Sequence, residues 1–304
     1  MRTPRLIALL SLPLFAAGCD RPLSDATVRM SAPGLYDNEL WLVPFTDLMI
    51  DLDGADPELA DWTVETDSTL VLDDAPSLFE GNLLVRVHSG DVGDGELSVL
   101  DDEGALVTTV PVHVRRPDGM YLTATVDGLE GARYVPGSSV PVLENEVTRM
   151  SVTYHLQDRG LGGSNQLVAS TATGLGYSVD HGEIDAVEIS ALDEPYDLTL
   201  EAGAATISLR VEPVALADAT LELVSNENRL PAGATASVRP RLRQKNGDMV
   251  FASPGRWTRD GAPLLAFYAY WYTYQPTATA SDVEVTFGGP GGLRATTTVH
   301  VREP

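Results

Sequence analysis

Three arginines in the C-terminal third of the chain alternate with apolar residues, at positions Arg239, Arg241 and Arg243. Because successive side chains of a β-strand point to opposite faces, this spacing places three guanidiniums on one face of a predicted strand and the apolar side chains on the other. Pro240 favours an edge or bulged strand, since proline has no N–H to donate to a ladder. Arginine is enriched where proteins bind one another, so the pattern predicts a contact surface.

A second run of alternating residues supports the same surface. The same period of two places four tyrosines on one face of a strand, at Tyr268, Tyr270, Tyr272 and Tyr274. We predict that these tyrosines and the three arginines form one surface, the Arg/Tyr face, which binds an acidic protein or a glycan whose sugar rings stack on the aromatic side chains. The alternative is that the tyrosines stack on the arginines through cation–π contacts and bind nothing.

A cluster of acidic residues around a glycine offers hard oxygen ligands at Asp51, Asp53 and Asp56. Ca²⁺ prefers such ligands, but the spacing lacks the third alternate acid and the terminal glutamate of an EF-hand loop. The alternative is a solvated acidic turn, which a chain with 44 acidic residues contains by chance. Calcium is therefore a weak candidate, and otherwise we expect no cofactor.

The remaining residue types predict no catalytic site and no enzyme. None of the five histidines has a His or Cys partner at zinc-ligand spacing. His113 and His300 each precede the valine that ends a similar segment, so internal repetition explains them better than metal binding. The chain has no Gly-x-Ser-x-Gly or Ser-x-x-Lys motif. The glycine-rich segments 160–163 and 288–292 are not followed by a helix, so they predict flexible loops and not phosphate cradles.

Charge excludes one class of partner. The chain carries 44 acidic and 20 basic residues, a net charge of −24. Nucleic acid is not an expected partner, because its phosphates would be repelled. The charge is also unevenly distributed: residues 19–212 hold 36 acidic and 9 basic side chains, and residues 213–304 hold 8 acidic and 9 basic ones. The C-terminal third is thus nearly neutral.

The N-terminus has the three parts of a secretory signal. Arg2 and Arg5 form a short positive segment, an apolar run follows, and small residues precede Cys19. The apolar run of about 12 residues is shorter than the roughly 20 needed to span a bilayer. Cys19 is the only cysteine, so no disulfide can form within the chain.

The segment Ala16, Ala17, Gly18 and Cys19 resembles the lipobox of bacterial lipoproteins, in which the cysteine becomes the lipidated first residue. Ala16 stands where that motif usually has leucine. The resemblance implies a membrane anchor at Cys19 and a place in the bacterial cell envelope, at the outer membrane or cell surface rather than the inner membrane. The alternative is an ordinary cleaved signal that leaves a free cysteine.

Alternation of apolar and polar residues with frequent Gly, Pro, Asp and Asn is typical of all-β sandwiches. Three similar hairpins recur, each a strand, a glycine-containing turn and a second strand, over residues 96–114, 196–211 and 283–301. Their last valines are 97 and 90 residues apart, which is the length of an immunoglobulin-like domain. Trp62 and Trp257 are predicted to fill the cores of the first and third repeats, and Tyr177 that of the second.

This pattern resembles the tandem bacterial Ig-like domains of surface proteins and lipoproteins. The expected fold is all-β, with three tandem immunoglobulin-like β-sandwich domains after a cleaved lipoprotein signal peptide. The expected segments are a signal peptide at 1–18, a lipidated tether at 19–25 and domains at 26–116, 117–212 and 213–304. Short proline-containing junctions near residues 117 and 213 predict semi-rigid joints.

Two functions follow from these expectations. The first is a non-catalytic envelope lipoprotein that acts as a spacer and uses its third domain for adhesion or assembly with a protein partner. The second is a carbohydrate-binding accessory module of an envelope polysaccharide system.

Overall fold

The computed structural model describes residues 28–54, 62–73, 76–79, 82–126, 129–134, 137–182, 184–227, 229–253, 255–264, 277 and 281–301. Within these ranges the regular secondary structure is almost entirely β-strand, and the helical elements are two 3₁₀ turns, η2 (Leu216–Asp218) and η4 (Pro290–Gly292). No helix in the described part is long and apolar enough to cross a membrane. The expected all-β fold is therefore confirmed.

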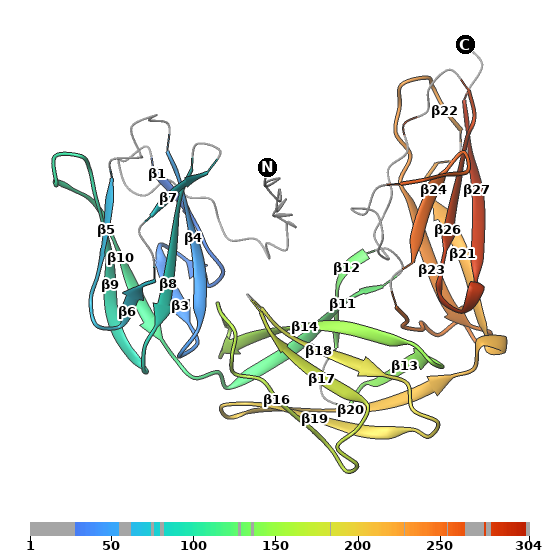
Figure 1. Cartoon of the computed structure of the whole chain (residues 1–304), viewed down its shortest axis with the longest axis horizontal. Helices are drawn as coiled ribbons and strands as arrows, with labels where there is room; N and C mark the ends of the chain where they lie inside the picture. The colour runs from blue at the N-terminus through green and yellow to red at the C-terminus, as the bar shows by residue number, and fades with distance from the viewer. Residues whose placement is uncertain are drawn as a thin grey trace, which may run out of the picture. The chain divides into compact units, whose positions relative to one another are not determined.

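The chain divides into two compact units, of which the first comprises Met1–Leu42 and Asp47–Val114. Its described residues form two five-stranded sheets, shown in blue and cyan in Figure 1. One sheet has the order β1 (Val28–Ser31), β4 (Asp47–Gly54), β8 (Asn82–Ser89) and β6 (Leu70–Leu72), with β7 (Ser77–Phe79) also paired to β8. The other has the order β2 (Leu35–Tyr36), β3 (Glu39–Leu42), β10 (Leu106–Val114), β9 (Gly93–Leu100) and β5 (Thr63–Thr66).

Alternation along each strand builds the core of this unit. In β8, the inward positions Leu83, Val85 and Val87 are at most 1% exposed, whereas the residues between them are half-buried or exposed. A shift of one residue in the pairing would turn all three side chains to the solvent, so burial fixes the register against β4. Side chains from both sheets meet in one apolar cluster.

Strand order identifies the sandwich as immunoglobulin-like. The order β1-β4-β8-β6 corresponds to strands A, B, E and D of that fold, and β10-β9-β5 corresponds to G, F and C. All pairs in this unit are antiparallel except β3 with β10, which are parallel. The same parallel pairing with the closing strand recurs twice further along the chain. It joins β13 (Ser139–Leu143) to β20 (Ala205–Val214) and β22 (Arg229–Leu230) to β27 (Arg294–Val301).

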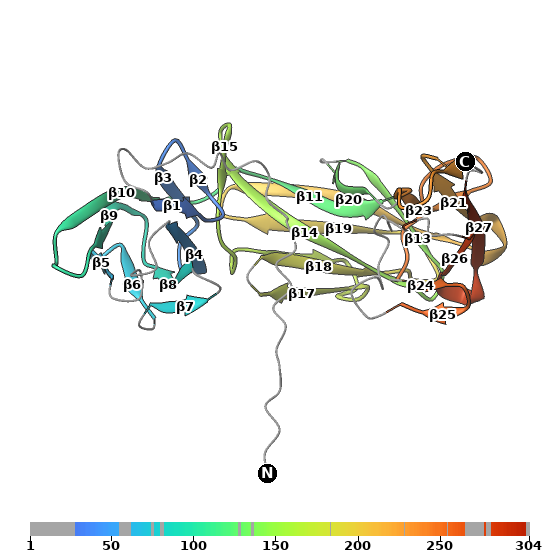
Figure 2. The same cartoon turned by 90° about the horizontal axis from the view of Figure 1, so that it is seen from above.

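The second unit comprises Val43–Thr46 and Arg115–Pro304. Its first sheet has the order β12 (Leu129–Tyr134), β11 (Gly119–Val126), β14 (Val147–Leu156), β18 (Asp185–Ser190) and β17 (Tyr177–His181), with β15 (Arg159–Leu161) also paired to β14. Its second sheet has the order β13 (Ser139–Leu143), β20 (Ala205–Val214), β19 (Tyr196–Ala202) and β16 (Val168–Thr171). Figure 2 shows β11, β14, β18 and β17 running side by side.

Two further sheets of the second unit lie in residues 219–301. One pairs β21 (Ala219–Ser225) with β23 (Val238–Gln244). The other has the order β22 (Arg229–Leu230), β27 (Arg294–Val301), β26 (Val283–Gly288), β24 (Arg256–Arg259) and β25 (Ala262–Pro263). Their inner faces meet in a cluster that includes Val238 from the first sheet and Trp257, Val285 and Phe287 from the second. The outer faces of these two sheets therefore point in opposite directions.

The three predicted hairpins are present. They are β9–β10, β19–β20 and β26–β27, all antiparallel. Glycine is required in their turns, since Gly104 has φ 78° and Gly203 has φ 59°, in the left-handed region that other residues avoid. The glycine-rich segments differ from the prediction of flexible loops: Gly160 lies in β15, Gly288 ends β26, and η4 covers Pro290–Gly292.

The predicted core aromatics have different outcomes. Trp257 is 2% exposed and packs edge-on against Phe287, with ring centroids 4.9 Å apart. Trp62 is only half-buried, beside the core of the first unit. The prediction for Tyr177 is wrong, because it lies half-exposed on the edge strand β17, while Tyr154 on the central strand β14 is fully buried.

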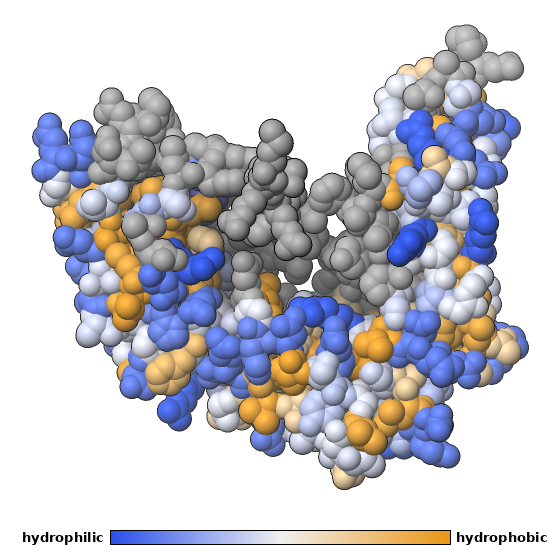
Figure 3. Space-filling view, in the orientation of Figure 1, coloured by the Kyte–Doolittle hydropathy of each residue, from blue (hydrophilic) through white to orange (hydrophobic). Residues whose placement is uncertain are grey.

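The predicted boundary near residue 213 lies inside the second unit. There Leu143, Val214 and Leu242 share one apolar cluster, and the N–H of Phe251 donates to the carbonyl of Pro141 at 2.8 Å. The division into three domains stays a prediction. On the face seen in Figure 3, apolar side chains are interspersed with polar ones in each unit.

Candidate functional site

The alternating arginines lie on β23 as the sequence predicts. Val238, Pro240 and Leu242 are buried against the core, while Arg239, Arg241 and Arg243 are half-exposed on the outer face. The strand register sets Arg241 opposite Glu222 of β21, and the two side chains form an ion pair at 3.3 Å.

The guanidinium of Arg243 donates to the carbonyl of Gly247 at 2.6 Å. Part of the positive charge on this face is thus compensated within the chain. The predicted tyrosine row, Tyr268, Tyr270, Tyr272 and Tyr274, lies outside the described residues. The structure therefore brings the three arginines together, and their partnership with the tyrosines stays a prediction.

The candidate calcium ligands do not form the turn that the sequence suggested. Asp51 and Asp53 continue strand β4, because this strand pairs with both β1 and β8 as far as residue 53. The Oδ2 atom of Asp51 accepts a hydrogen bond from the side-chain amide of Asn82 at 3.1 Å. Asp56 lies outside the described residues. Within the described ranges no group of three or more His, Cys, Asp or Glu could hold a metal ion.

Two histidines occupy equivalent positions in their hairpins. His113 of β10 lies opposite Asp94 of β9, with Nδ1 and Oδ1 2.6 Å apart. His300 of β27 approaches Asp282, the residue before β26, with Nδ1 and Oδ2 2.7 Å apart. His113 also packs on Trp41, with ring centroids 4.4 Å apart. The repeated cross-strand pair agrees with the interpretation that repetition, and not metal binding, accounts for these histidines.

The hydrogen bond from His300 lowers the pKa of Asp282, and a second hydrogen bond from the Val301 N–H acts in the same direction. Both groups are donors that favour the charged carboxylate. The pair closes the end of the β26–β27 hairpin, where β22 also joins the sheet.

A buried carboxylate that the sequence did not reveal organises the second unit. Asp185, at the start of β18, is fully buried. Its Oδ1 atom accepts hydrogen bonds from the N–H of Asn165 at 2.9 Å and from Nδ1 of His181 at 2.7 Å. Its Oδ2 atom accepts from the N–H of Gln166 at 2.9 Å, from the N–H of Leu167 at 3.1 Å and from the hydroxyl of Tyr154. Five donors thus compensate the cost of burying one charge.

Tyr154 supplies the deepest of these donors. Burial raises the pKa of Tyr154, and the negative charge of Asp185 raises it further. The phenol therefore stays protonated and donates to the carboxylate. Because every contact of Asp185 holds the polypeptide in place, this cluster of Tyr, Asp and His is a structural network without a nucleophile open to a substrate.

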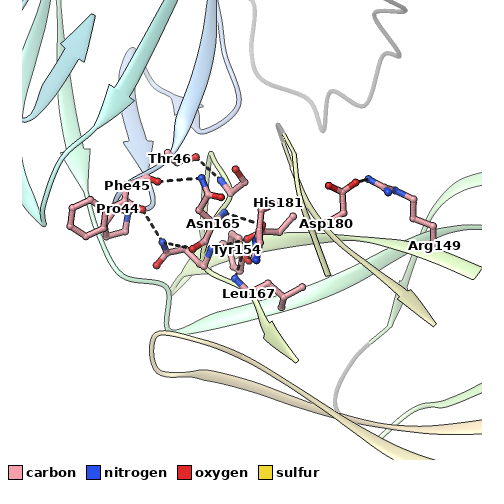
Figure 4. Close-up of polar contacts among 12 residues, drawn as sticks. Pro44, Phe45, Thr46, Arg149, Tyr154, Asn165, Leu167, Asp180 and His181 are labelled. Carbon is pink, nitrogen blue, oxygen red and sulfur yellow. Dashed lines mark hydrogen bonds and ion pairs between the residues drawn. The ribbon is translucent and has the colours of Figure 1, made fainter. Parts of the chain in front are cut away.

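The loop of residues 164–167, which Asp185 holds, also forms hydrogen bonds with residues 44–46 of the second unit (Figure 4). The side-chain amide of Gln166 donates to the carbonyl of Pro44 at 2.8 Å, and that of Asn165 donates to the carbonyl of Phe45 at 3.3 Å. The N–H of Ser164 donates to the hydroxyl of Thr46 at 2.6 Å. Residues 164–167 therefore connect two parts of the second unit. The backbone N–H groups of residues 165–167 donate to Asp185, whereas donors of residues 164–166 bind residues 44–46.

Gly163 is required in this loop. Its φ of 114° is strained for any residue with a side chain, and a Cβ atom there would lie 2.4 Å from the side chain of Thr46. A sequence signal for Asp185 does exist: it occupies the inward parity of β18 together with Val187 and Ile189. An acid at such a position must be paired if the strand is buried.

A second missed residue is Tyr196, the first residue of β19. Its hydroxyl lies 2.6 Å from the carbonyl oxygen of Gly176 and 2.8 Å from that of Ser190, six residues upstream. A tyrosine at the start of strand F that binds the backbone upstream is the tyrosine corner of immunoglobulin-like sandwiches. Burial raises the pKa of Tyr196 to about 12.

An open groove of about 530 Å³ lies in the second unit. Arg256, Gly288 and Arg294 form part of its wall, together with Glu146 and Leu293. Arg256, Gly288 and Arg294 come from the neighbouring strands β24, β26 and β27.

Strand order and the tyrosine corner define the class of this chain as an all-β protein of immunoglobulin-like sandwiches. No protein-family model matches the chain. No curated protein matches it either.

Among solved structures, the chain is similar to FdeC, an adhesin of Escherichia coli, with 12% identity and a TM-score of 0.25 over 94% of this chain and 100% of that one. It is similar to domains 4–9 of the surface layer protein SbsC, with 14% identity and a TM-score of 0.29 over 90% of this chain and 47% of that one. It is also similar to the I9–I11 tandem of titin, with 10% identity and a TM-score of 0.24 over 86% of this chain and 95% of that one.

Proposed function

We propose that this chain is a non-catalytic lipoprotein of the bacterial cell envelope, anchored through a lipid on Cys19 at the outer membrane or cell surface. Its sandwiches act as a spacer, and the Arg/Tyr face binds an acidic protein partner in adhesion or in an envelope assembly. The small residues before the single cysteine support the anchor. The sandwich architecture supports the spacer, because such domains present loops and sheet faces on a rigid scaffold.

The observation that carries the binding role is the alternation of β23. Three guanidiniums share one outer face because the residues between them are held in the core. Arg241 forms an ion pair with Glu222, so a double substitution of Arg239 and Arg243 tests this face without breaking that pair. Arginine at the centre of an interface often contributes more than about 1 kcal/mol of binding energy, which is a change in affinity of about fivefold or more.

The binding role is tested by affinity capture from envelope extracts at low and at physiological salt. We expect the wild-type chain to retain a partner that the Arg239→Gln/Arg243→Gln and Tyr270→Ser/Tyr272→Ser variants lose. Salt should weaken the capture, because exposed charges are screened within about 8 Å at physiological ionic strength. The control is Arg149→Gln/Arg210→Gln, which removes the same two charges from exposed ion pairs elsewhere in the unit. Identical partners for all four proteins would contradict the binding role.

The anchor is tested separately by Cys19→Ser. We expect this variant to leave the membrane fraction, since its side chain carries no thiol to lipidate. A variant that remained membrane-bound would contradict lipid anchoring and would leave the binding role to be judged by its own experiment.

A further inference from the structure

A row of three paired residues with a glycine in the middle lines the groove in the second unit. Arg256, Gly288 and Arg294 lie opposite one another on adjacent strands. Side chains of directly paired residues point to the same face of a sheet. Gly288 has no side chain, so the row consists of two guanidinium-bearing side chains on either side of bare backbone.

The spacing of the two arginines follows from the sheet. Neighbouring strands are about 4.8 Å apart, so the Cα atoms of Arg256 and Arg294 are separated by roughly 9.6 Å across the glycine. Gly288 and Gly289 also line the groove, and neither has a side chain. Among the described lining residues the one large apolar side chain is that of Leu293, which is half-buried.

The two groove arginines differ from several other arginines of the described residues. Both are exposed, and neither forms an ion pair within the described residues. By contrast, Arg149, Arg210 and Arg241 each pair with a carboxylate. In a chain with 44 acidic and 20 basic residues, two neighbouring arginines without a carboxylate are positioned to take one from a ligand.

Hydroxyl groups continue the same face. The next row on the outward side of these strands consists of Thr258, Thr286 and Thr296, which are paired across β24, β26 and β27. Two of them already bind each other, with Oγ1 atoms 2.8 Å apart. Thr286 is buried, whereas Thr296 is exposed and Thr258 is half-buried. The hydroxyls of Thr258 and Thr296 can donate and accept, which suits a ligand that is itself rich in hydroxyls.

We propose that this groove binds an acidic oligosaccharide, a sugar chain that carries carboxylate or sulfate groups. One guanidinium holds each of two anionic groups, and the glycine backbone lets the sugar rings approach the sheet. A sugar chain that extends beyond the groove along this face reaches the hydroxyls of Thr296, which is exposed, and Thr258, which is half-buried. An acidic peptide fits less well, because the described residues of the groove include no aromatic side chain to receive the anchor residues that dominate peptide and protein contacts.

Glu146 limits what the groove accepts. It is the acidic residue in the groove lining, and no ion pair joins it to Arg256 or Arg294 within the described residues. Its carboxylate accepts hydrogen bonds from sugar hydroxyls and repels a third anionic group. The ligand class is therefore a chain with spaced acidic groups and neutral sugars between them.

The groove lies on a different sheet face from the arginines of the Arg/Tyr face. Arg239 and Arg243 lie on the outer face of the β21–β23 sheet, whereas Arg256 and Arg294 lie on the outer face of the opposite sheet. Failure of one binding role therefore leaves the other untouched.

The experiment is a titration of the full chain, followed by calorimetry, with four hexameric probes: oligogalacturonate, a heparin-derived sulfated hexasaccharide, maltohexaose and hexaglutamate. We expect binding of oligogalacturonate, the sulfated probe or both, and the stronger of the two identifies the carboxylate or the sulfate as the natural anion. We expect maltohexaose and hexaglutamate to bind at least tenfold more weakly. Affinity should fall as salt rises.

Three variants locate the site. Arg256→Gln/Arg294→Gln should weaken binding at least tenfold. Gly288→Leu should weaken it equally while keeping both charges, because the added side chain fills the gap between the arginines. Among the described residues, a Cβ atom at Gly288 meets one atom within 4 Å, the carbonyl oxygen of Arg256 at 3.9 Å, so the strand has room for the substitution. Arg149→Gln/Arg210→Gln removes the same charge elsewhere and should leave the affinity unchanged.

Three outcomes would overturn the proposal. They are no binding of either acidic oligosaccharide, wild-type affinity in the Gly288→Leu variant, and hexaglutamate binding as tightly as the sugars. The last result would assign the groove to acidic peptides.

Discussion

Replacing Asp185 by asparagine tests the claim that a buried carboxylate holds residues 164–167 in place. Asparagine has the same shape but offers one acceptor oxygen and an NH₂ group that only donates. If the NH₂ group replaces Oδ2, the N–H groups of Gln166 and Leu167 both lose their acceptor. If the NH₂ group replaces Oδ1, the N–H of Asn165 alone loses its acceptor, provided that Nδ1 of His181 changes from donor to acceptor and binds the NH₂ group. The second orientation is the less costly one.

The magnitude follows from this count. One orphaned buried N–H costs about 1–3 kcal/mol, and the remaining bonds lose the strength that a charged acceptor gives them. We expect the loop to lose about 2–4 kcal/mol in Asp185→Asn and about 3–5 kcal/mol in Asp185→Ala, where all five donors lose their acceptor. Since 1.4 kcal/mol is a factor of about ten, amide hydrogen exchange at residues 165–167 should accelerate by roughly 30- to 1,000-fold in the asparagine variant.

The assay has two readouts. Hydrogen exchange measures the opening of the loop, and NMR of the imidazole identifies which nitrogen of His181 carries the proton. In the wild type, Nδ1 must carry it, because an ionised carboxylate only accepts. In Asp185→Asn we expect it on Nε2. The control is Asp180→Asn, which breaks an exposed ion pair with Arg149 and should change stability by no more than about 0.5 kcal/mol. Unchanged exchange together with an unchanged His181 tautomer would refute the network.

Three other predictions concern the cores and the hairpins. Tyr196→Phe removes a hydroxyl shared by two carbonyls and should cost about 1–3 kcal/mol in urea denaturation. Because the pKa of Tyr196 is raised to about 12 in the folded chain from 10.0, its contribution is complete below pH 10 and is lost as pH rises towards 12, a loss that melting curves of the phenylalanine variant should lack. Trp257→Ala should cost about 3–5 kcal/mol, measured by the same denaturation, and a loss below about 1 kcal/mol would show that this side chain is not a core residue. The pKa of Asp282 is lowered from 3.8, so its contribution is present above that pH and is lost as pH falls through the lower folded value; NMR titration should show this, and His300→Ala should move the pKa of Asp282 upwards.

Local patterns predicted the elements that local patterns determine. Alternating apolar residues and a glycine-containing turn predict each hairpin, and all three hairpins are present at the expected places. Alternation also placed Arg239, Arg241 and Arg243 on one face. It did not reveal that Arg241 faces Glu222, because that pairing depends on the register between strands from separate parts of the chain.

The misjudged aromatic of the second repeat shows the same limit. Tyr177 and Tyr154 both lie in strands with alternating residues. Only the order of strands in the sheet decides that β14 is central and β17 is at the edge. Tyr154 can be buried because Asp185 accepts a hydrogen bond from its hydroxyl, and Asp185 is 31 residues away in sequence. A sequence pattern with a period of two carries no information about such a pairing.

Net charge is an equally poor guide to the groove. The chain as a whole repels anions, yet exposed charges are screened beyond about 8 Å at physiological ionic strength. An anion in the groove therefore responds to Arg256, Arg294 and Glu146, a local balance of two positive charges against one negative charge. That balance exists because strand register sets two arginines on either side of Gly288. A glycine that the sequence predicted in a flexible loop is thus the residue that leaves room for a ligand.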